Sequence, residues 1–183
     1  MKAITMISKI NFAWFLLSIA SVGLAPISSF AQDDSGRKQA DEHLQSELDK
    51  IDNLFLKTSE TSAGNKMWII MWEDSGETTK IAIELRDLGK YDHKPIYGML
   101  AYASVVETES PVPPAVIKAI ATKNERTGLG HFSSDEAFQT IYINSTAPCD
   151  TLTAGQLWII FAYIHQNRIE FKGEISQLMA GSK

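Results

Sequence analysis

The fold is decided by the stretch Met67-Trp-Ile-Ile-Met-Trp72 and by the two segments that follow it, Asp74-Ser-Gly-Glu77 and Thr79-Lys-Ile-Ala-Ile-Glu-Leu85. The first stretch is rich in residues that favour β-strands, and the last one alternates apolar and polar residues with a period of two. A short turn sequence that contains glycine lies between them. Two strand patterns joined in this way predict a β-hairpin, and they predict an antiparallel sheet built around it.

The first strand of this hairpin is apolar on both faces, because successive side chains of a strand point to opposite sides. One set is Trp68, Ile70 and Trp72, and the other set is Met67, Ile69 and Met71. A sheet that helices cover on one face only is expected to alternate apolar and polar residues. Two explanations remain open: a helix or loop of the same chain covers the second face, or this face is buried against another chain. We predict that Trp68, Ile70 and Trp72 form a patch that binds a partner.

The N-terminal half of the chain also shows a helical pattern. An amphipathic helix is predicted from Ala40 onward, because apolar residues recur at spacings of three and four. These residues are Leu44, Leu48, Ile51 and Phe55. The polar residues 58–65 then predict a loop. A third strand is predicted over residues 96–106, after the hairpin.

The C-terminal half predicts two helices and two strands. Prolines at positions 111, 113 and 114 introduce a helix over residues 115–126. Strands are predicted at 131–132 and 137–144. A long helix is predicted from about Ala154 into the 160s, with Thr151 or Thr153 as its N-cap, and a last helical stretch follows a kink near Gly173. The apolar stripe of the long helix is Leu157, Trp158, Ile160, Phe161 and Ile164.

These elements predict an α+β fold. We expect a mainly antiparallel five-stranded sheet with helices packed on it, in the order αβββαββα. No internal repeat or domain boundary is apparent, so one domain is expected over residues 40–183.

Residues 1–31 have the three parts of a secretory signal peptide. Lys2 and Lys9 give a positively charged start, residues 12–24 form an apolar run, and Ser29-Phe30-Ala31 places small residues at the exit. The apolar run is shorter than the roughly 20 residues that a spanning helix needs, so cleavage is favoured over a membrane anchor. We expect an exported protein, periplasmic or secreted, with no membrane span after cleavage and a flexible leader over residues 32–39.

The composition sets limits on the function. The 183 residues are 44% apolar and 21% charged, with a formal net charge of −5, as in an ordinary globular domain. The acidic balance gives no electrostatic reason to expect nucleic acid as a partner. The one cysteine, Cys149, excludes a disulfide within the chain. We expect this thiol to be buried or to lie in a loop, with pairing between two chains as the alternative.

Few residues indicate chemistry. The histidines are His43, His93, His131 and His165, and none has the spacing of a metal site. No motif for a cofactor is present, and we expect none to be bound. His131 followed by Asp135 is the least unfavourable candidate for a general base.

Four features occur together along the chain. They are the hairpin with its third strand, the proline-initiated helix that ends in Ala121-Thr-Lys-Asn124, a glycine loop with His131-Phe-Ser-Ser-Asp135, and Leu152-Thr-Ala-Gly-Gln-Leu157 at the start of a long helix. Their order and spacing resemble the YbjN family of bacterial sensory-transduction regulators, over about residues 40–180. The resemblance implies a fold similar to that of type III secretion chaperones and implies no catalytic residues. The signal peptide is a departure, because the chaperone relatives work in the cytoplasm.

The sequence therefore favours an exported, non-catalytic module of the YbjN-like type that binds a protein or regulates one. Its partner is expected to be another protein, and a chaperone-like role or a homodimer fits the same pattern. A structural component of the cell envelope is one alternative. A periplasmic enzyme with a composite site around His131 and Asp135 is the other.

Overall fold

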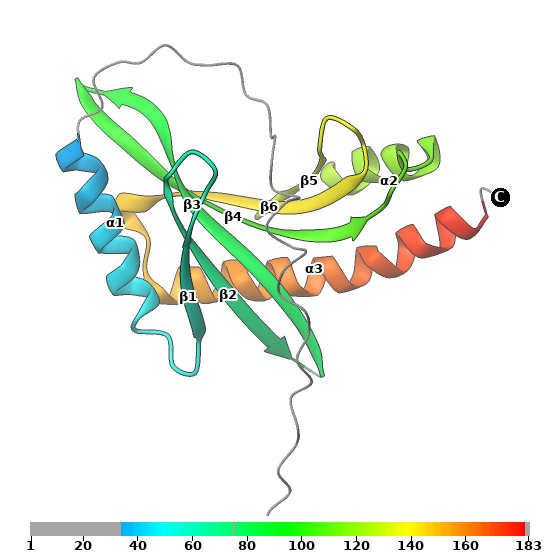
Figure 1. Cartoon of the computed structure of the whole chain (residues 1–183), viewed down its shortest axis with the longest axis horizontal. Coiled ribbons are helices and arrows are strands. Elements are labelled where there is room, and N and C mark those ends of the chain that lie inside the picture. Colours follow the sequence, from blue (N-terminus) through cyan, green and yellow to red (C-terminus); the bar gives the residue numbers. More distant parts are fainter. Residues whose placement is uncertain (1–33, 75, 182–183) are drawn as a thin grey trace, which may run out of the picture.

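Six antiparallel strands form one sheet in the computed structural model, which describes residues 34–74 and 76–181 (Figure 1). The elements are α1 (Asp34–Leu48), β1 (Phe55–Glu60), β2 (Lys66–Asp74), β3 (Glu77–Tyr91), β4 (Lys94–Glu107), α2 (Pro114–Asn124), β5 (His131–Ser134), β6 (Thr140–Pro148), the 3-10 helix η1 (Cys149–Thr151) and α3 (Ala154–Ala180). The strands lie in the order β1-β2-β3-β4-β6-β5. The α+β class is confirmed, but the prediction of five strands is wrong, because Phe55–Glu60 adds a strand at the edge.

The predicted hairpin is formed by β2 and β3, with Trp68 opposite Ile83 and Ile70 opposite Ile81. The strands β3 and β4 form a second, longer hairpin. Its turn places Asp92 and His93 at φ angles of 49° and 63°, the left-handed conformation that a two-residue type I′ turn requires. The polar residues 86–94 therefore extend this hairpin beyond the neighbouring strands (Figure 1).

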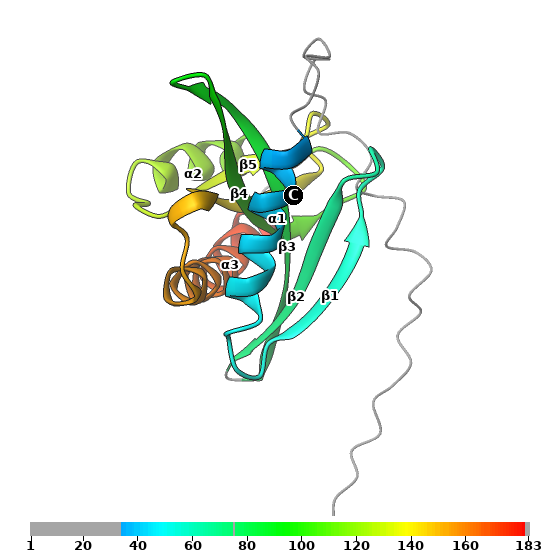
Figure 2. The same ribbon diagram turned by 90° about the vertical axis from the view of Figure 1, so that its left-hand side faces the viewer.

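All three helices lie on the same face of the sheet (Figure 2). The core between them and the sheet contains Trp68 and Ile83 from the strands, and Leu44, Val116 and Phe161 from the helices. Burial of such side chains contributes about 1.5–3 kcal/mol each, so this one-sided layer supplies most of the stabilisation of the fold. Among the described residues, no helix lies on the opposite face of the sheet, and we call it the uncovered face.

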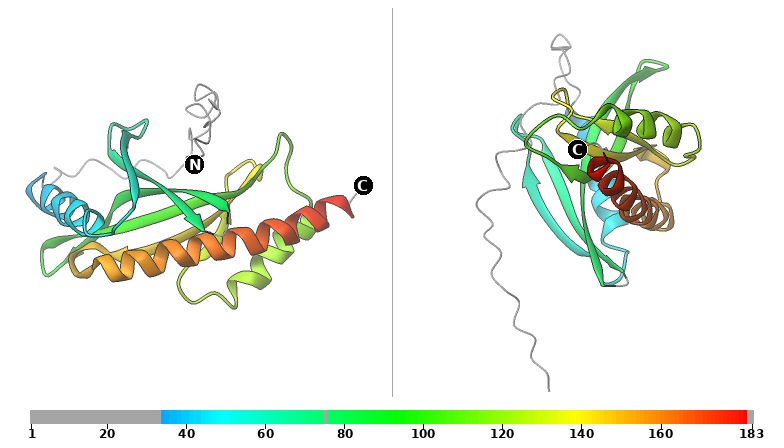
Figure 3. Two further views of the ribbon diagram at one scale, coloured as in Figure 1. Left: turned by 90° about the horizontal axis from the view of Figure 1, so that it is seen from below. Right: turned by 90° about the vertical axis from the view of Figure 1, so that its right-hand side faces the viewer.

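Helix α3 runs most of the length of the molecule (Figure 3). It begins with a capping box, because the Thr153 hydroxyl accepts from the Gln156 amide and the Gln156 side chain accepts from the Thr153 amide. The prediction of Thr153 as a candidate N-cap is confirmed. The predicted kink near Gly173 is wrong, because the helix continues unbroken to Ala180 with Phe171 and Ile175 buried on either side. Packing of these two side chains outweighs the cost of about 1 kcal/mol for a helical glycine.

The N-terminal part departs from two predictions. Helix α1 begins at Asp34 and ends at Leu48, so the predicted leader over 32–39 is helical from residue 34, and Phe55 lies in a strand instead of the predicted helix. The predicted signal peptide over residues 1–31 lies outside the described residues. Within the part that the structure describes, no helix combines the length and the apolar character needed to cross a membrane.

Candidate functional site

The two faces of β2 have different surroundings. Trp68 and Ile70 are completely buried against the helices. The indole Nε1 of Trp68 donates to Gln45 Oε1 on α1 at 2.7 Å, which satisfies the one polar group of this side chain. The prediction that Trp68 and Ile70 form a binding patch therefore needs correction, because both side chains belong to the core.

Trp72, the third member of the predicted patch, lies at the end of β2 on the same face. Its ring is in edge contact with Trp158, at 5.6 Å between centroids, and with Phe161, at 6.2 Å. Both partners belong to α3. The helices of the same chain therefore cover the Trp68, Ile70 and Trp72 face of β2. The three residues that alternate with them along β2, Met67, Ile69 and Met71, point to the second face, on the other side of the sheet.

The uncovered face is apolar where β1, β2 and β3 lie side by side. Phe55 is directly opposite Met71, and Met71 is opposite Lys80; in the next row, Lys57 is opposite Ile69. Phe55 is 64% exposed and Met71 is 38% exposed, which is unusual for large apolar side chains in a sheet. We call these five residues the β1–β3 patch. It combines an exposed aromatic ring, a methionine and an isoleucine with two lysines.

The part of the uncovered face on β3, β4 and β6 is polar. The Tyr102 hydroxyl donates to Glu84 Oε1 at 2.6 Å, and Arg86 Nη2 lies 2.9 Å from Glu84 Oε2. The ring of Tyr142 is in edge contact with Tyr102, at 6.1 Å. Burial, followed by the hydrogen bond to Glu84, raises the pKa of Tyr102. The Tyr102 hydroxyl and the Glu84 carboxylate are thus paired within this polar half of the face, whereas the buried Arg86 Nε has no hydrogen-bond partner among the described residues.

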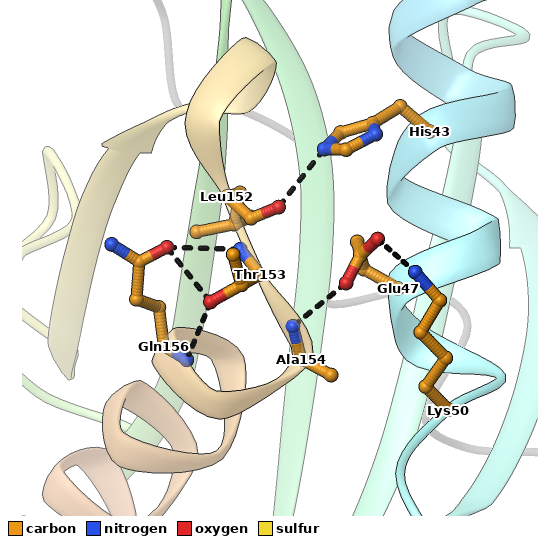
Figure 4. Close-up of polar contacts among 7 residues, drawn as sticks. All are labelled: His43, Glu47, Lys50, Leu152, Thr153, Ala154 and Gln156. Carbon is orange, nitrogen blue, oxygen red and sulfur yellow. Dashed lines mark hydrogen bonds and ion pairs between the residues drawn. The ribbon is translucent and has the colours of Figure 1, made fainter.

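The start of α3 is fixed by α1 (Figure 4). Glu47 Oε2 accepts from the Ala154 amide at 2.9 Å, Glu47 Oε1 pairs with Lys50, and His43 Nε2 donates to the Leu152 carbonyl at 2.9 Å. The hydrogen bonds from Lys50 and from the Ala154 amide lower the pKa of Glu47. A carboxylate at this position also interacts favourably with the helix dipole. This junction holds the first turns of α3, and with them Trp158, in place.

The residues named for an enzymatic alternative do not come together. His131 begins β5 and Asp135 follows its end, so the two are about 13 Å apart along an extended strand. The carboxylate of Asp135 accepts from the Gln139 amide at 2.7 Å and thereby closes the turn before β6. Among the described residues, no group of three or more His, Cys, Asp or Glu side chains has the arrangement of a metal site.

Cys149 is buried, which is one of the placements that the sequence leaves open for it. Its Sγ lies 3.4 Å from the Ala40 carbonyl oxygen, on α1. Burial raises the pKa of the thiol to about 11. In the folded chain this cysteine is therefore a core residue, and pairing between two chains would require local unfolding.

Two residues of the exposed surface lie elsewhere than the sequence predicts. Phe55 was assigned to a helix because it continues the spacing of Leu48 and Ile51, whereas it begins the edge strand β1. Trp158 was assigned to a buried stripe, and its side chain is 52% exposed. A signal was present for the first, because asparagine adopts a positive φ angle more readily than most residues, and Asn53, with φ of 60°, lies in the turn between the end of α1 and the start of β1.

Comparison of the chain with protein-family models gives no match, and comparison with curated proteins gives none either.

Proposed function

We propose that this protein is a non-catalytic binding module that holds an extended segment of another protein on its β1–β3 patch. The observation that carries the proposal is the pairing of Phe55 and Met71, two strongly exposed apolar side chains in direct contact positions on a face that no helix covers. Aromatic residues and methionine are enriched in protein interfaces.

The position of β1 supports an extended partner. This strand ends the sheet, so within the described part of the chain one of its edges pairs with no other strand. Such an edge accepts an additional strand through main-chain hydrogen bonds, and the side chains of the added strand alternate between the two faces. Every second side chain of the partner would then lie beside Phe55 and Lys57.

The charges of the patch favour an acidic partner. Lys57 and Lys80 flank the apolar side chains, although the whole chain carries a net negative charge. Burial lowers the pKa of Lys80, which means that its charge is poorly solvated where it stands. The Glu107 carboxylate acts in the opposite direction, and a further carboxylate from a partner would add to the stabilisation of the charged form. The partner segment is therefore expected to combine apolar residues with Asp or Glu.

We further propose that the protein is exported and that it is a YbjN-like regulator with a fold related to type III secretion chaperones. Export is supported by the pattern of residues 1–31, and the family by the order of elements and motifs over residues 40–180. The six antiparallel strands with three helices on one face are compatible with this assignment.

The proposal is tested by crosslinking at defined positions. A photoreactive phenylalanine analogue replaces Phe55 in one variant and Tyr91 in a control, since Tyr91 is also exposed but lies at the tip of the β3–β4 hairpin. The crosslinked peptide is identified in cells that produce the protein. We expect a discrete apolar and acidic segment from another protein at position 55 and not at position 91. Capture of the same proteins at both positions, or of a second copy of this chain only, would overturn the proposal.

The captured segment is then synthesised, and its affinity is measured by calorimetry. Met71→Glu places a negative charge in the patch, which repels the acidic residues of the partner segment, and it is expected to abolish binding. Leu129→Glu is the matched control, because Leu129 is 51% exposed in a loop before β5 and lies outside the patch. Equal binding by the two variants would show that the patch is not the binding surface.

A further inference from the structure

A hollow of about 510 Å³ lies where the end of β2 meets α3. Its lining residues are Trp72, Glu73, Asp74, Trp158, Ala162, His165 and Gln166. Those from α3 occur at spacings of four, three and one, which places them on one side of the helix. The hollow is separate from the β1–β3 patch, since Trp72 points to the helices whereas Met71 points to the uncovered face.

Two tryptophan rings form one wall of the hollow. Trp72 and Trp158 meet edge to face, with an interplanar angle of 67°. Trp72 is held from behind by Phe161, so its ring has a fixed orientation. Trp158 is 52% exposed although it is on a helix whose other large apolar side chains are mostly buried. An exposed indole placed against a second one is a preformed aromatic surface.

The remaining wall carries negative charge. Asp74 lies on the same face of β2 as Trp72 and contributes a carboxylate, whereas the side chain of Glu73 alternates to the opposite face. Neither lysine nor arginine is among the described residues that line the hollow. At its base, His165 is buried, and its Nδ1 shares a hydrogen bond of 2.8 Å with the Thr79 hydroxyl, which fixes the imidazole ring. Aromatic faces attract cations through their quadrupole, and nearby carboxylates add to this attraction.

We propose that this hollow binds an organic cation, a guanidinium or a quaternary ammonium group, between the wall formed by the two indoles and the carboxylate of Asp74. The aromatic rings offer no lone pair to a metal ion, whereas weakly hydrated organic cations stack on them at little desolvation cost. The volume accommodates one such group with its attached chain. The site uses different residues from the β1–β3 patch, so each of the two proposals is tested independently of the other.

The test compares each cation with its uncharged analogue of the same shape. Choline is paired with 3,3-dimethylbutanol, and N-acetylarginine methylamide is paired with the citrulline compound. Calorimetry and tryptophan emission of the purified protein are followed during titration. We expect at least one cation to saturate the site at millimolar concentration while its neutral analogue does not. The cation that binds with the higher affinity identifies the natural ligand as a free quaternary amine or as an arginine side chain of a protein.

Two substitutions locate the binding, each with a matched control. Trp158→Ala is expected to weaken binding about five- to thirtyfold, whereas Ile159→Ala, on an equally exposed neighbour, leaves it unchanged. Asp74→Asn is expected to weaken it about two- to fivefold, whereas Glu73→Gln, on the neighbouring residue whose side chain faces the other side of β2, has no effect. The proposal is overturned if the neutral analogues bind as well as the cations, if no cation binds, or if a variant and its control behave alike.

Discussion

Truncation of two adjacent residues of β2 tests the assignment of its faces. Ile70 is fully buried against the helices, whereas Met71 is 38% exposed on the uncovered face. Ile70→Ala removes three carbon atoms from a packed core and leaves a cavity, which costs about 3–4 kcal/mol. Met71→Ala removes a side chain that keeps much of its contact with water, so the loss is expected to be below about 1 kcal/mol.

In a chain of this length each kcal/mol lowers the melting temperature by about 2–4 °C. Ile70→Ala is therefore expected to melt roughly 10 °C below the wild type, and Met71→Ala within about 3 °C of it. Calorimetry gives the melting temperature, and urea titration monitored by circular dichroism gives the free energy of unfolding. An equal loss of stability in the two variants would refute the assignment, because it would mean that both side chains are buried to the same extent in the folded chain.

Three further perturbations address α1 and α3. Thr153→Ala removes the N-cap of α3 and is expected to cost about 1 kcal/mol in urea titration, while Thr151→Ala, in η1, serves as the control. Cys149 is expected to resist iodoacetamide in the native protein and to react at once in urea, because its thiol is buried and its pKa is raised to about 11. Glu47 has a lowered pKa in the folded chain, so it stabilises the fold above about pH 4.3 and this contribution is lost as the pH falls further. Glu47→Gln should therefore be less stable than the wild type at pH 7 and approach it in acid, and a constant difference would contradict this.

The fold was largely predictable wherever a strand or helix has one buried side. Strand β3 and helix α2 carry clear periods of two and of three to four residues, because each is packed on one face by the core. The start of α3 was equally clear, since Thr153 and Gln156 provide a capping pair. These signals are local, and the local sequence suffices to show them.

The strand β1 was missed for a physical reason. A strand at the edge of a sheet is exposed on much of its surface. The sequence Phe-Leu-Lys-Thr-Ser-Glu of β1 therefore shows no alternation of apolar and polar residues that would distinguish it from a loop. Its first residue also completes the helical spacing of Leu48 and Ile51. Whether Phe55 belongs to a helix or to a strand depends on pairing with Met71, sixteen residues later, and a local pattern does not contain that information.

The local sequence likewise does not show which face of β2 the helices cover. Both sets of side chains are large and apolar, and the decision depends on where α3 crosses the sheet. The contact of Trp72 with Trp158 and Phe161 shows which side that is. The candidate patch was therefore placed in the right strand and on the wrong face.

The structure also explains why β2 is apolar on both sides. Its inner side chains complete the core, which any sheet covered by helices requires. Its outer side chains are not needed for the core, because a sheet face that is exposed to solvent is stable with polar residues. The hydrogen bond between Tyr102 and Glu84 on the neighbouring strands is an example. Exposed Phe55 and Met71 add little to folding, and the exposed apolar pair raises the risk of aggregation. An exposed apolar surface that adds little stability supports the proposal that the β1–β3 patch binds a partner, and Met71, not Trp72, is therefore the residue at which partner binding is to be tested.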